Sequence, residues 1–163
     1  MKYRILSQTE QQLFGAEVMC TFDNTDVAAL GASTTGNIAV VPGTTNGAQP
    51  AVGTSGTDTL PAGYAIKFKY LVVDTAFVSG TAAGLAITIG DSGSATRHLA
   101  STQLQSGQSP VTGAGGITNE YYIATAIATN VYFTSTTANL STFTAGQARA
   151  FFSLKDLSQL PKF

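Results

Sequence analysis

Several short segments of the chain alternate apolar residues with polar or small ones, which places the two kinds on opposite faces of a β-strand. The clearest case lies between residues 64 and 89, where a Gly-containing turn separates two such segments. The first predicts a strand with one face formed by Ile66, Phe68, Tyr70 and Val72. The second predicts a strand with one face formed by Leu85, Ile87 and Ile89. We expect both strands to contribute to a core.

The same alternation predicts further strands at 15–22, 37–41, 120–128, 131–136 and 147–154. Asn130 would separate the third of these from the fourth, so that 120–128 and 131–136 form a hairpin. We expect turns at 23–26 and 142–146, and one or two helical turns within 95–104. No amphipathic helix of ordinary length appears. The pattern predicts one all-β domain over residues 1–163, an antiparallel β-sandwich of jelly-roll type.

Three segments have little alternation. Residues 1–14 are compatible with a short strand, a first helical turn or an N-terminal arm laid on a neighbouring subunit. Residues 42–61 contain three of the five prolines and almost no large apolar group, which predicts a long exposed loop. Such a loop could be a solvated insertion or a contact with a partner. Residues 90–116 form a second long polar stretch.

The chain carries little charge. Charged residues make up 10% of it and the formal net charge is -1, against roughly 25% charged residues in an ordinary soluble domain. Electrostatic repulsion between copies is therefore weak, which permits assembly. No cluster of Lys and Arg is present, so we expect no direct binding to nucleic acid. We also expect no membrane span and no signal peptide, since no long apolar run is present.

The residue types that usually bind metals are too few here to form a site. Cys20 lies in an alternating segment and is expected to be a buried apolar side chain rather than a reactive thiol. Cys20 and His98 are the single cysteine and the single histidine, which is too few for zinc. Asp91 is the one carboxylate of its loop, which is too few for calcium. Asp23 and Asp26 are expected in a solvated turn. We expect no metal and no cofactor.

The segment Gly90-Asp91-Ser92-Gly93 resembles the nucleophile loop of chymotrypsin-like serine proteases. A serine nucleophile needs an imidazole within hydrogen-bond reach and a carboxylate to orient it. His98 follows Ser92 by six residues, whereas the histidine of those proteases lies far upstream in a separate barrel. We therefore expect no catalytic residue, and we interpret Asp91 as capping a turn. The glycine-rich segment 113–116 lacks the strand and helix needed to bind a phosphate and is expected to be plain loop.

Two aromatic residues lie on the less apolar faces of their predicted strands. Phe151 shares its face with Gln147 and Arg149, and Tyr122 shares its face with alanines. Both rings could therefore form an exposed contact patch. The alternative is that both rings are covered within one subunit or one oligomer.

Two motifs carry a resemblance to a known group of proteins. The stretch ITIGDSGSATRHLAS, with the strand before it, and the stretch TANLSTFTAGQARAFFSLKDL resemble segments of small structural proteins of tailed bacteriophages. The match covers roughly residues 64–157, and the weakly charged Ala-, Thr- and Gly-rich composition agrees with it. The resemblance assigns no functional residue.

This resemblance implies a non-enzymatic virion protein, made in the host cytoplasm and located on the capsid surface. Small jelly-roll members of the group include capsid decoration or cement proteins, which commonly form trimers and bind across subunits of the major capsid protein. The contact elements would then be residues 1–14, 42–61 and 90–116. A second expectation is a tail or fibre-base module that binds host glycan or another tail protein, with Tyr121, Tyr122 and Phe151 as candidate contact residues.

Overall fold

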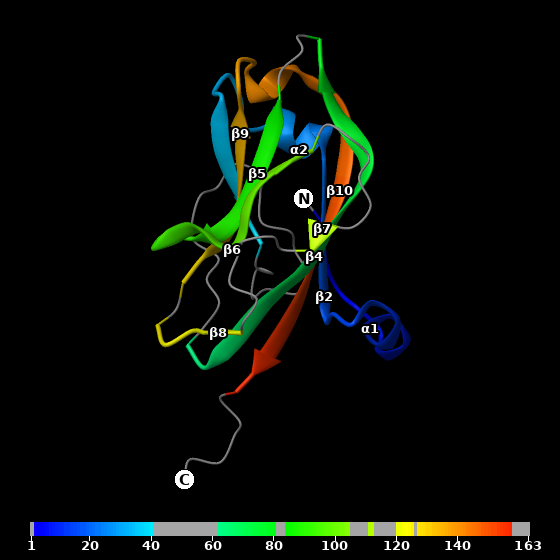
Figure 1. Ribbon diagram of the computed structural model, residues 1–163, viewed down its shortest axis with the longest axis vertical. Helices are drawn as coiled ribbons and strands as arrows, with labels where there is room; N and C mark the ends of the chain where they lie inside the picture. Colours follow the sequence, from blue (N-terminus) through cyan, green and yellow to red (C-terminus); the bar gives the residue numbers. More distant parts are fainter. Residues whose placement is uncertain are drawn as a thin grey trace.

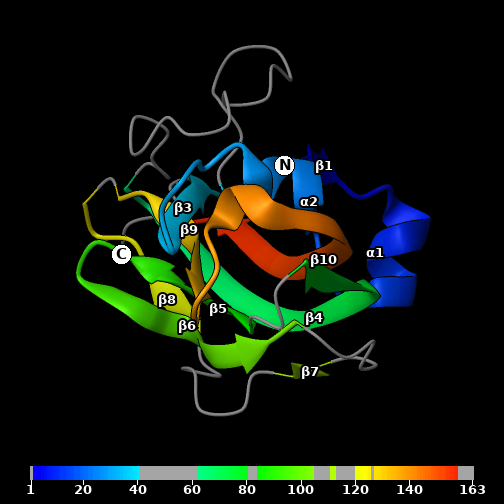
Figure 2. The same ribbon diagram turned by 90° about the horizontal axis from the view of Figure 1, so that it is seen from above.

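The protein is a sandwich of two antiparallel β-sheets (Figures 1 and 2). The computed structural model describes residues 2–40, 62–80, 84–104, 111–112, 120–125 and 127–157. The large sheet has the order β1 (Lys2–Ile5), β2 (Val18–Asp23), β10 (Phe143–Asp156), β4 (Tyr64–Ser79) and β7 (Val111–Thr112), with β8 (Tyr121–Tyr122) also paired to β4. The small sheet has the order β3 (Thr35–Ala39), β9 (Thr129–Ser135), β5 (Leu85–Asp91) and β6 (Ser94–Gln103).

The predicted antiparallel β-sandwich is confirmed, and its jelly-roll type stays a prediction. Helices are short in the described residues: α1 (Gln8–Phe14), α2 (Asn24–Ala28) and the 3-10 turn η1 (Leu140–Thr142). None of these described helices has the length and apolar character needed to cross a membrane. The expected loop at 42–61 and the glycine-rich segment 113–116 lie outside the described residues.

The main core lies between the two sheets. The ring of Phe22 on β2 meets the ring of Phe133 on β9 edge to face, with centroids 5.4 Å apart. Phe77 on β4 packs on the same Phe22 ring at 6.1 Å. Aromatic rings bury more apolar area than other side chains, so the Phe22–Phe133 contact holds the two sheets face to face, while Phe77 packs beside Phe22 from the same large sheet. Cys20 is fully buried in this core, as expected, and burial raises the pKa of its thiol.

A β-bulge at Lys69 divides the faces of strand β4. Phe68 pairs with Phe152 of β10 and Tyr70 pairs with the adjacent Phe151, which leaves Lys69 as an extra residue. Because side chains alternate, one extra residue moves every later side chain to the other face. The predicted face is therefore correct for Phe68 but wrong for Tyr70 and Val72, which lie on the outer face of the large sheet.

The N-terminal segment is part of the sandwich and not a free arm. Strand β1 pairs with β2, and Ser7 is the N-cap of α1, where its side chain and that of Glu10 form a capping box. Residues 6–16, which lie between β1 and β2, cover part of the outer face of the large sheet. A second apolar cluster forms there from Leu6, Phe14, Ala16, Met19, Tyr70, Val72 and Phe151.

The expected solvated turn at 23–26 is wrong. Asp23 caps helix α2: its carboxylate accepts hydrogen bonds from the backbone N–H groups of Thr25 and Asp26, at 2.9 and 3.1 Å. The Asp26 carboxylate accepts one from the Asp23 N–H, at 3.1 Å, and Asp26 is buried. Aspartate is favoured both in turns and at helix N-caps, so the composition alone did not separate the two.

Three further expectations are corrected. Residues 95–104 form most of strand β6 instead of helical turns. Asn130 lies inside β9 and does not interrupt a strand. Strand β8 belongs to the large sheet and β9 to the small one, so 120–128 and 131–136 form no hairpin.

The expected turn at 142–146 is also wrong, because strand β10 begins at Phe143. Gly146 lies inside this strand with φ of +137°, and the Phe77 ring packs on it so closely that a Cβ atom would lie 2.3 Å from the ring. A glycine in this segment therefore marks an irregular strand instead of a turn.

Candidate functional site

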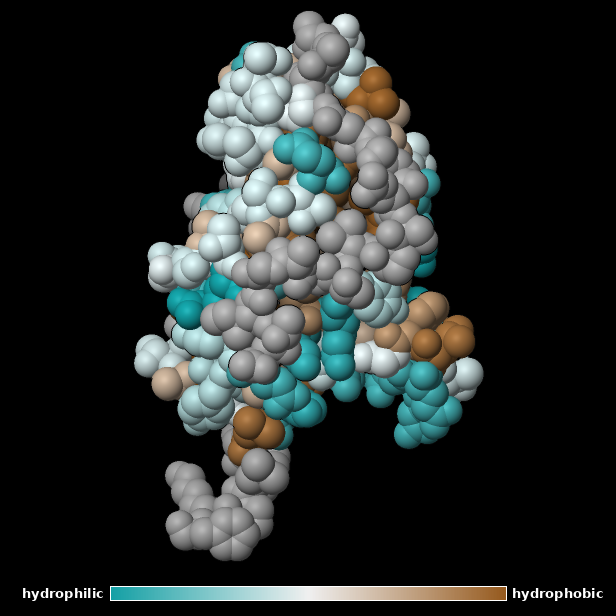
Figure 3. Space-filling model, in the orientation of Figure 1, coloured by the Kyte–Doolittle hydropathy of each residue, from teal (hydrophilic) through white to brown (hydrophobic). Residues whose placement is uncertain are grey.

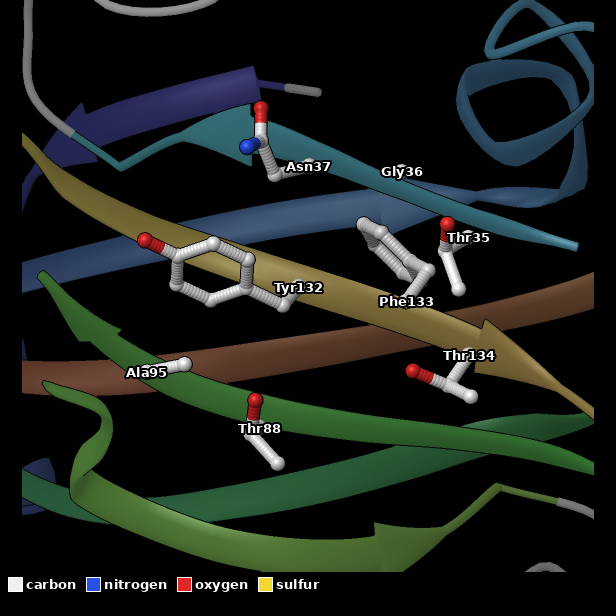
Figure 4. Close-up of a pocket in the computed structure, with 8 residues that line it drawn as sticks. All are labelled: Thr35, Gly36, Asn37, Thr88, Ala95, Tyr132, Phe133 and Thr134. Carbon is white, nitrogen blue, oxygen red and sulfur yellow. The ribbon is translucent and has the colours of Figure 1, made fainter. Parts of the chain in front are cut away.

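An open groove of about 330 Å³, with uncharged polar side chains among an otherwise apolar lining, lies on the outer face of the small sheet (Figure 4). Its polar side chains come from three neighbouring strands and are Thr35 and Asn37 of β3, Tyr132 and Thr134 of β9, and Thr88 of β5. Gly36, Ala95 and Phe133 complete the lining. None of the eight lining residues carries a charge. We refer to this site as the outer groove.

Strand register brings these side chains into rows. Tyr132 lies between its partners Asn37 on one side and Thr88 on the other, and Thr134 lies beside Thr35. Directly opposed side chains on neighbouring strands have Cβ atoms about 5 Å apart, so the row 37–132–88 spans about 10 Å. The inward positions of β9 are buried while Tyr132 and Thr134 are accessible. The outer groove is thus the uncovered face of a sheet whose other face forms the core.

One end of the outer groove is closed by the β5–β6 hairpin. A Cβ atom at Gly90 would lie 2.1 Å from the carbonyl oxygen of Ser94 and 2.5 Å from the carbonyl carbon of Ala95. The backbone of β6 therefore passes directly over Gly90, and this brings Ala95 to the groove wall. Only glycine permits so close a backbone approach.

The ring of Tyr132 forms the floor of the outer groove. Figure 4 shows this ring lying along the sheet with its face outward, between Asn37 and Thr88. Nδ2 of Asn130 lies 3.5 Å from the Tyr132 hydroxyl and can donate to it. Asn130 is itself buried, and its Oδ1 has no hydrogen-bond partner among the described residues. The contact between the Asn130 amide and the Tyr132 hydroxyl is thus at the long end of the hydrogen-bond range.

The segment Gly90-Asp91-Ser92-Gly93 spans the end of β5 and the two-residue turn, Ser92-Gly93, of the β5–β6 hairpin. Asp91 is almost fully buried and accepts hydrogen bonds from the backbone N–H groups of Gly93 and Ser94, at 2.8 and 2.9 Å, and from the Arg97 guanidinium. Burial alone would raise the pKa of the Asp91 carboxyl, but these hydrogen bonds outweigh it and hold the pKa below its ordinary value. The expected capping role of Asp91 is confirmed.

The structure does not bring Ser92 and His98 together as a catalytic pair. Ser92 is exposed in the turn, whereas His98 is 2% exposed and its Nδ1 has no hydrogen-bond partner among the described residues. Burial lowers the pKa of His98 to about 4, so the imidazole is neutral near pH 7. Within the described ranges no three His, Cys, Asp or Glu residues gather as they would around a metal ion.

The three candidate contact aromatics lie in different environments. Phe151 is 1% exposed, because Phe14 and Tyr70 cover it, so of the two alternatives left open for this ring the covered one is correct. Tyr122 is 57% exposed, which agrees with a contact role. Tyr121 is half-buried, with the Arg97 guanidinium 4.3 Å from its ring centroid. The three rings therefore do not form one patch.

A second surface feature lies at the N-terminal corner, which we define as residues 4–15. Helix α1 buries none of its residues, and Leu13 within it is 76% exposed. Ile5 on the adjoining strand is 69% exposed. Figure 3 shows hydrophobic atoms at the surface where α1 lies in Figure 1. Neither side chain contributes to the apolar cluster beneath this corner.

The outer groove was not predicted from the sequence. Thr88, Tyr132 and Thr134 lie at outward positions of alternating strands, and these polar positions were the one indication of it in the sequence. The register that joins β3, β9 and β5 is a long-range property, however, and no local pattern shows which strands are neighbours.

Comparisons of the chain with protein-family models, with curated proteins and with solved structures gave no match.

Proposed function

We propose that this protein is a non-enzymatic structural component of a virion, a capsid decoration protein that binds across subunits of the major capsid protein. The observation that carries the proposal is the N-terminal corner, where Ile5 and Leu13 are exposed on elements that need neither side chain for the core. An exposed apolar group of this kind gains free energy only when a partner covers it.

The low charge of the chain supports assembly. A net charge of -1 on 163 residues gives little long-range repulsion between copies or between a copy and a shell. Figure 3 shows pale, weakly polar residues over much of the surface above β3, β9 and β5. From the resemblance to small tailed-phage structural proteins we further propose that the partner is the major capsid protein and that the protein forms trimers.

The protein would stabilise the shell by thermodynamic linkage between binding and assembly. A protein that binds only the assembled shell stabilises it by RT ln(1 + [L]/Kd), about 2.7 kcal/mol per site at a hundredfold excess over Kd. Many such sites, one at each junction, raise the temperature at which the shell opens.

Binding to shells that lack this protein tests the proposal. Saturating protein is expected to co-sediment with the shells and to raise their disruption temperature. Leu13→Asp is expected to weaken binding about tenfold or more, because it places a charge in an apolar contact. Val78→Asp is the matched control, since Val78 is 51% exposed but lies toward the far end of the large sheet, paired with Ala145. An unchanged disruption temperature with saturating wild-type protein would remove the proposal.

The alternative, a tail module that binds glycan through Tyr121, Tyr122 and Phe151, is less well supported. Phe151 is buried and Tyr121 is partly covered by Arg97, which leaves Tyr122 as the accessible ring of the three.

A further inference from the structure

We propose that the outer groove binds a neutral oligosaccharide. The proposal is independent of the capsid proposal, because it rests on the small sheet and not on the N-terminal corner.

The chemistry of the lining selects the class of ligand. Threonine hydroxyls both donate and accept hydrogen bonds, and the Asn37 amide does both through separate atoms. Sugar hydroxyl groups have the same dual character and so match this lining. No lining side chain is charged, so nothing in the groove compensates an anionic or a cationic ligand.

The shape of the groove supports the same ligand. The outward face of the Tyr132 ring, with Asn37 and Thr88 on its two sides, offers an apolar surface flanked by polar groups. A pyranose ring presents an apolar C–H face and a rim of hydroxyl groups, which is the complementary arrangement. The row of about 10 Å fits about two sugar units, given the spacing of neighbouring strands.

The floor of the groove is held in place before a ligand arrives. Strand pairing fixes the backbones of β3, β9 and β5, which carry the lining side chains. A site that needs little ordering loses less free energy on binding.

The test is a titration of the isotope-labelled full chain with maltohexaose, cellohexaose, chitohexaose and mannohexaose, each to about 10 mM, a range that detects the millimolar affinities expected of an open site. Hexagalacturonate serves as the anionic comparison. At least one neutral probe is expected to shift the backbone amide signals of Thr88, Tyr132 and Thr134. Hexagalacturonate is expected to shift none of them.

Variants then locate the site. Tyr132→Ala is expected to weaken binding about tenfold or more, because the stacking surface is lost. Thr88→Val keeps the shape of the side chain and is expected to weaken binding about threefold to tenfold through one lost hydrogen bond. Thr96→Val, at an exposed position of β6 outside the lining, is the matched control and is expected to bind as the wild type does.

Any of three results would overturn the proposal: no neutral probe shifts these amides, hexagalacturonate binds as tightly as the best neutral probe, or Thr88→Val binds as the wild type does. Since valine is well tolerated in strands, the Thr88 variant decides the matter even if Tyr132→Ala does not fold.

Discussion

The rings of Tyr70 and Phe151 stack with their centroids 4.6 Å apart and their planes at 23°. The two residues are register partners on β4 and β10, and the bulge at Lys69 turns Tyr70 to the outer face where Phe151 lies. The Tyr70 hydroxyl then donates to the backbone carbonyl of Phe14 at 3.1 Å. This pair therefore joins the large sheet to the N-terminal segment that covers it.

The first prediction concerns this pair. Phe151→Ala is expected to lower the free energy of unfolding by about 3–5 kcal/mol, because it leaves a cavity beneath the N-terminal segment. Chemical denaturation measures the change. Tyr122→Ala removes an exposed aromatic ring and should cost no more than about 0.5 kcal/mol. Equal losses for the two variants would mean that Phe151 is not covered as described.

Local alternation predicted the core residues where a strand is regular. Leu85, Ile87 and Ile89 are buried as expected, and so is Cys20, because each lies in a run whose period of two is unbroken. The sequence could not show the bulge at Lys69, because the extra residue is defined by its pairing with β10, which lies more than seventy residues away.

Strand β6 was missed for a different reason. Its residues Ser94–Gln103 contain few large apolar side chains, since the strand lies at the edge of the small sheet and buries little besides His98 and Leu99. The pairing that makes it a strand comes from β5. The outer groove escaped detection in the same way, because its residues meet only through the register of three strands.

The second prediction compares two ion pairs. Asp91 is buried, and its carboxylate accepts hydrogen bonds from Arg97 and from two backbone N–H groups. Asp74 forms a two-point ion pair with Arg149, at 2.6 and 2.8 Å, but both side chains remain partly exposed. Asp91→Ala should therefore lower the free energy of unfolding by about 2–3 kcal/mol, since it leaves the half-buried Arg97 guanidinium and two backbone N–H groups without their acceptor. Asp74→Ala should cost about 1 kcal/mol or less. Denaturant titration of both variants at pH 7 measures the difference, and equal losses would contradict it.

The third prediction is a dependence of stability on pH through His98. Burial lowers the pKa of the native imidazole to about 4, whereas the unfolded chain has the ordinary value of 6.5. Between these values the unfolded state binds more protons, so the native state loses stability as the pH falls from about 6.5 to 4. The loss is roughly 3 kcal/mol, at about 1.4 kcal/mol for each pKa unit.

The groups that face His98 are Asp91, Arg97 and the Tyr121 ring. Arg97 stays charged throughout, and Asp91, whose pKa is lowered, loses its contribution only at pH values below this window. A His98→Gln variant should therefore have a nearly flat free energy of unfolding between pH 6.5 and about 5, above the range in which Glu10 and Glu120, whose pKa values are lowered by hydrogen bonds, lose their contributions. A slope as steep as that of the wild type in this variant would assign the effect to another group.

The fourth prediction concerns the crossing of β6 over Gly90. In Gly90→Ala the new methyl group would lie 2.1 Å from the Ser94 carbonyl oxygen, and backbone atoms cannot move aside as a flexible side chain can. We expect a loss of about 2 kcal/mol or more in the free energy of unfolding, since overpacking forces the backbone to shift. Gly80→Ala is the matched control, because nothing lies within 4 Å of a Cβ atom there, and it should change stability by no more than about 0.5 kcal/mol. Thermal and denaturant unfolding compare the two variants. If both variants were equally stable, β6 would not pass over Gly90 as described. The outer groove would then not be closed at this end.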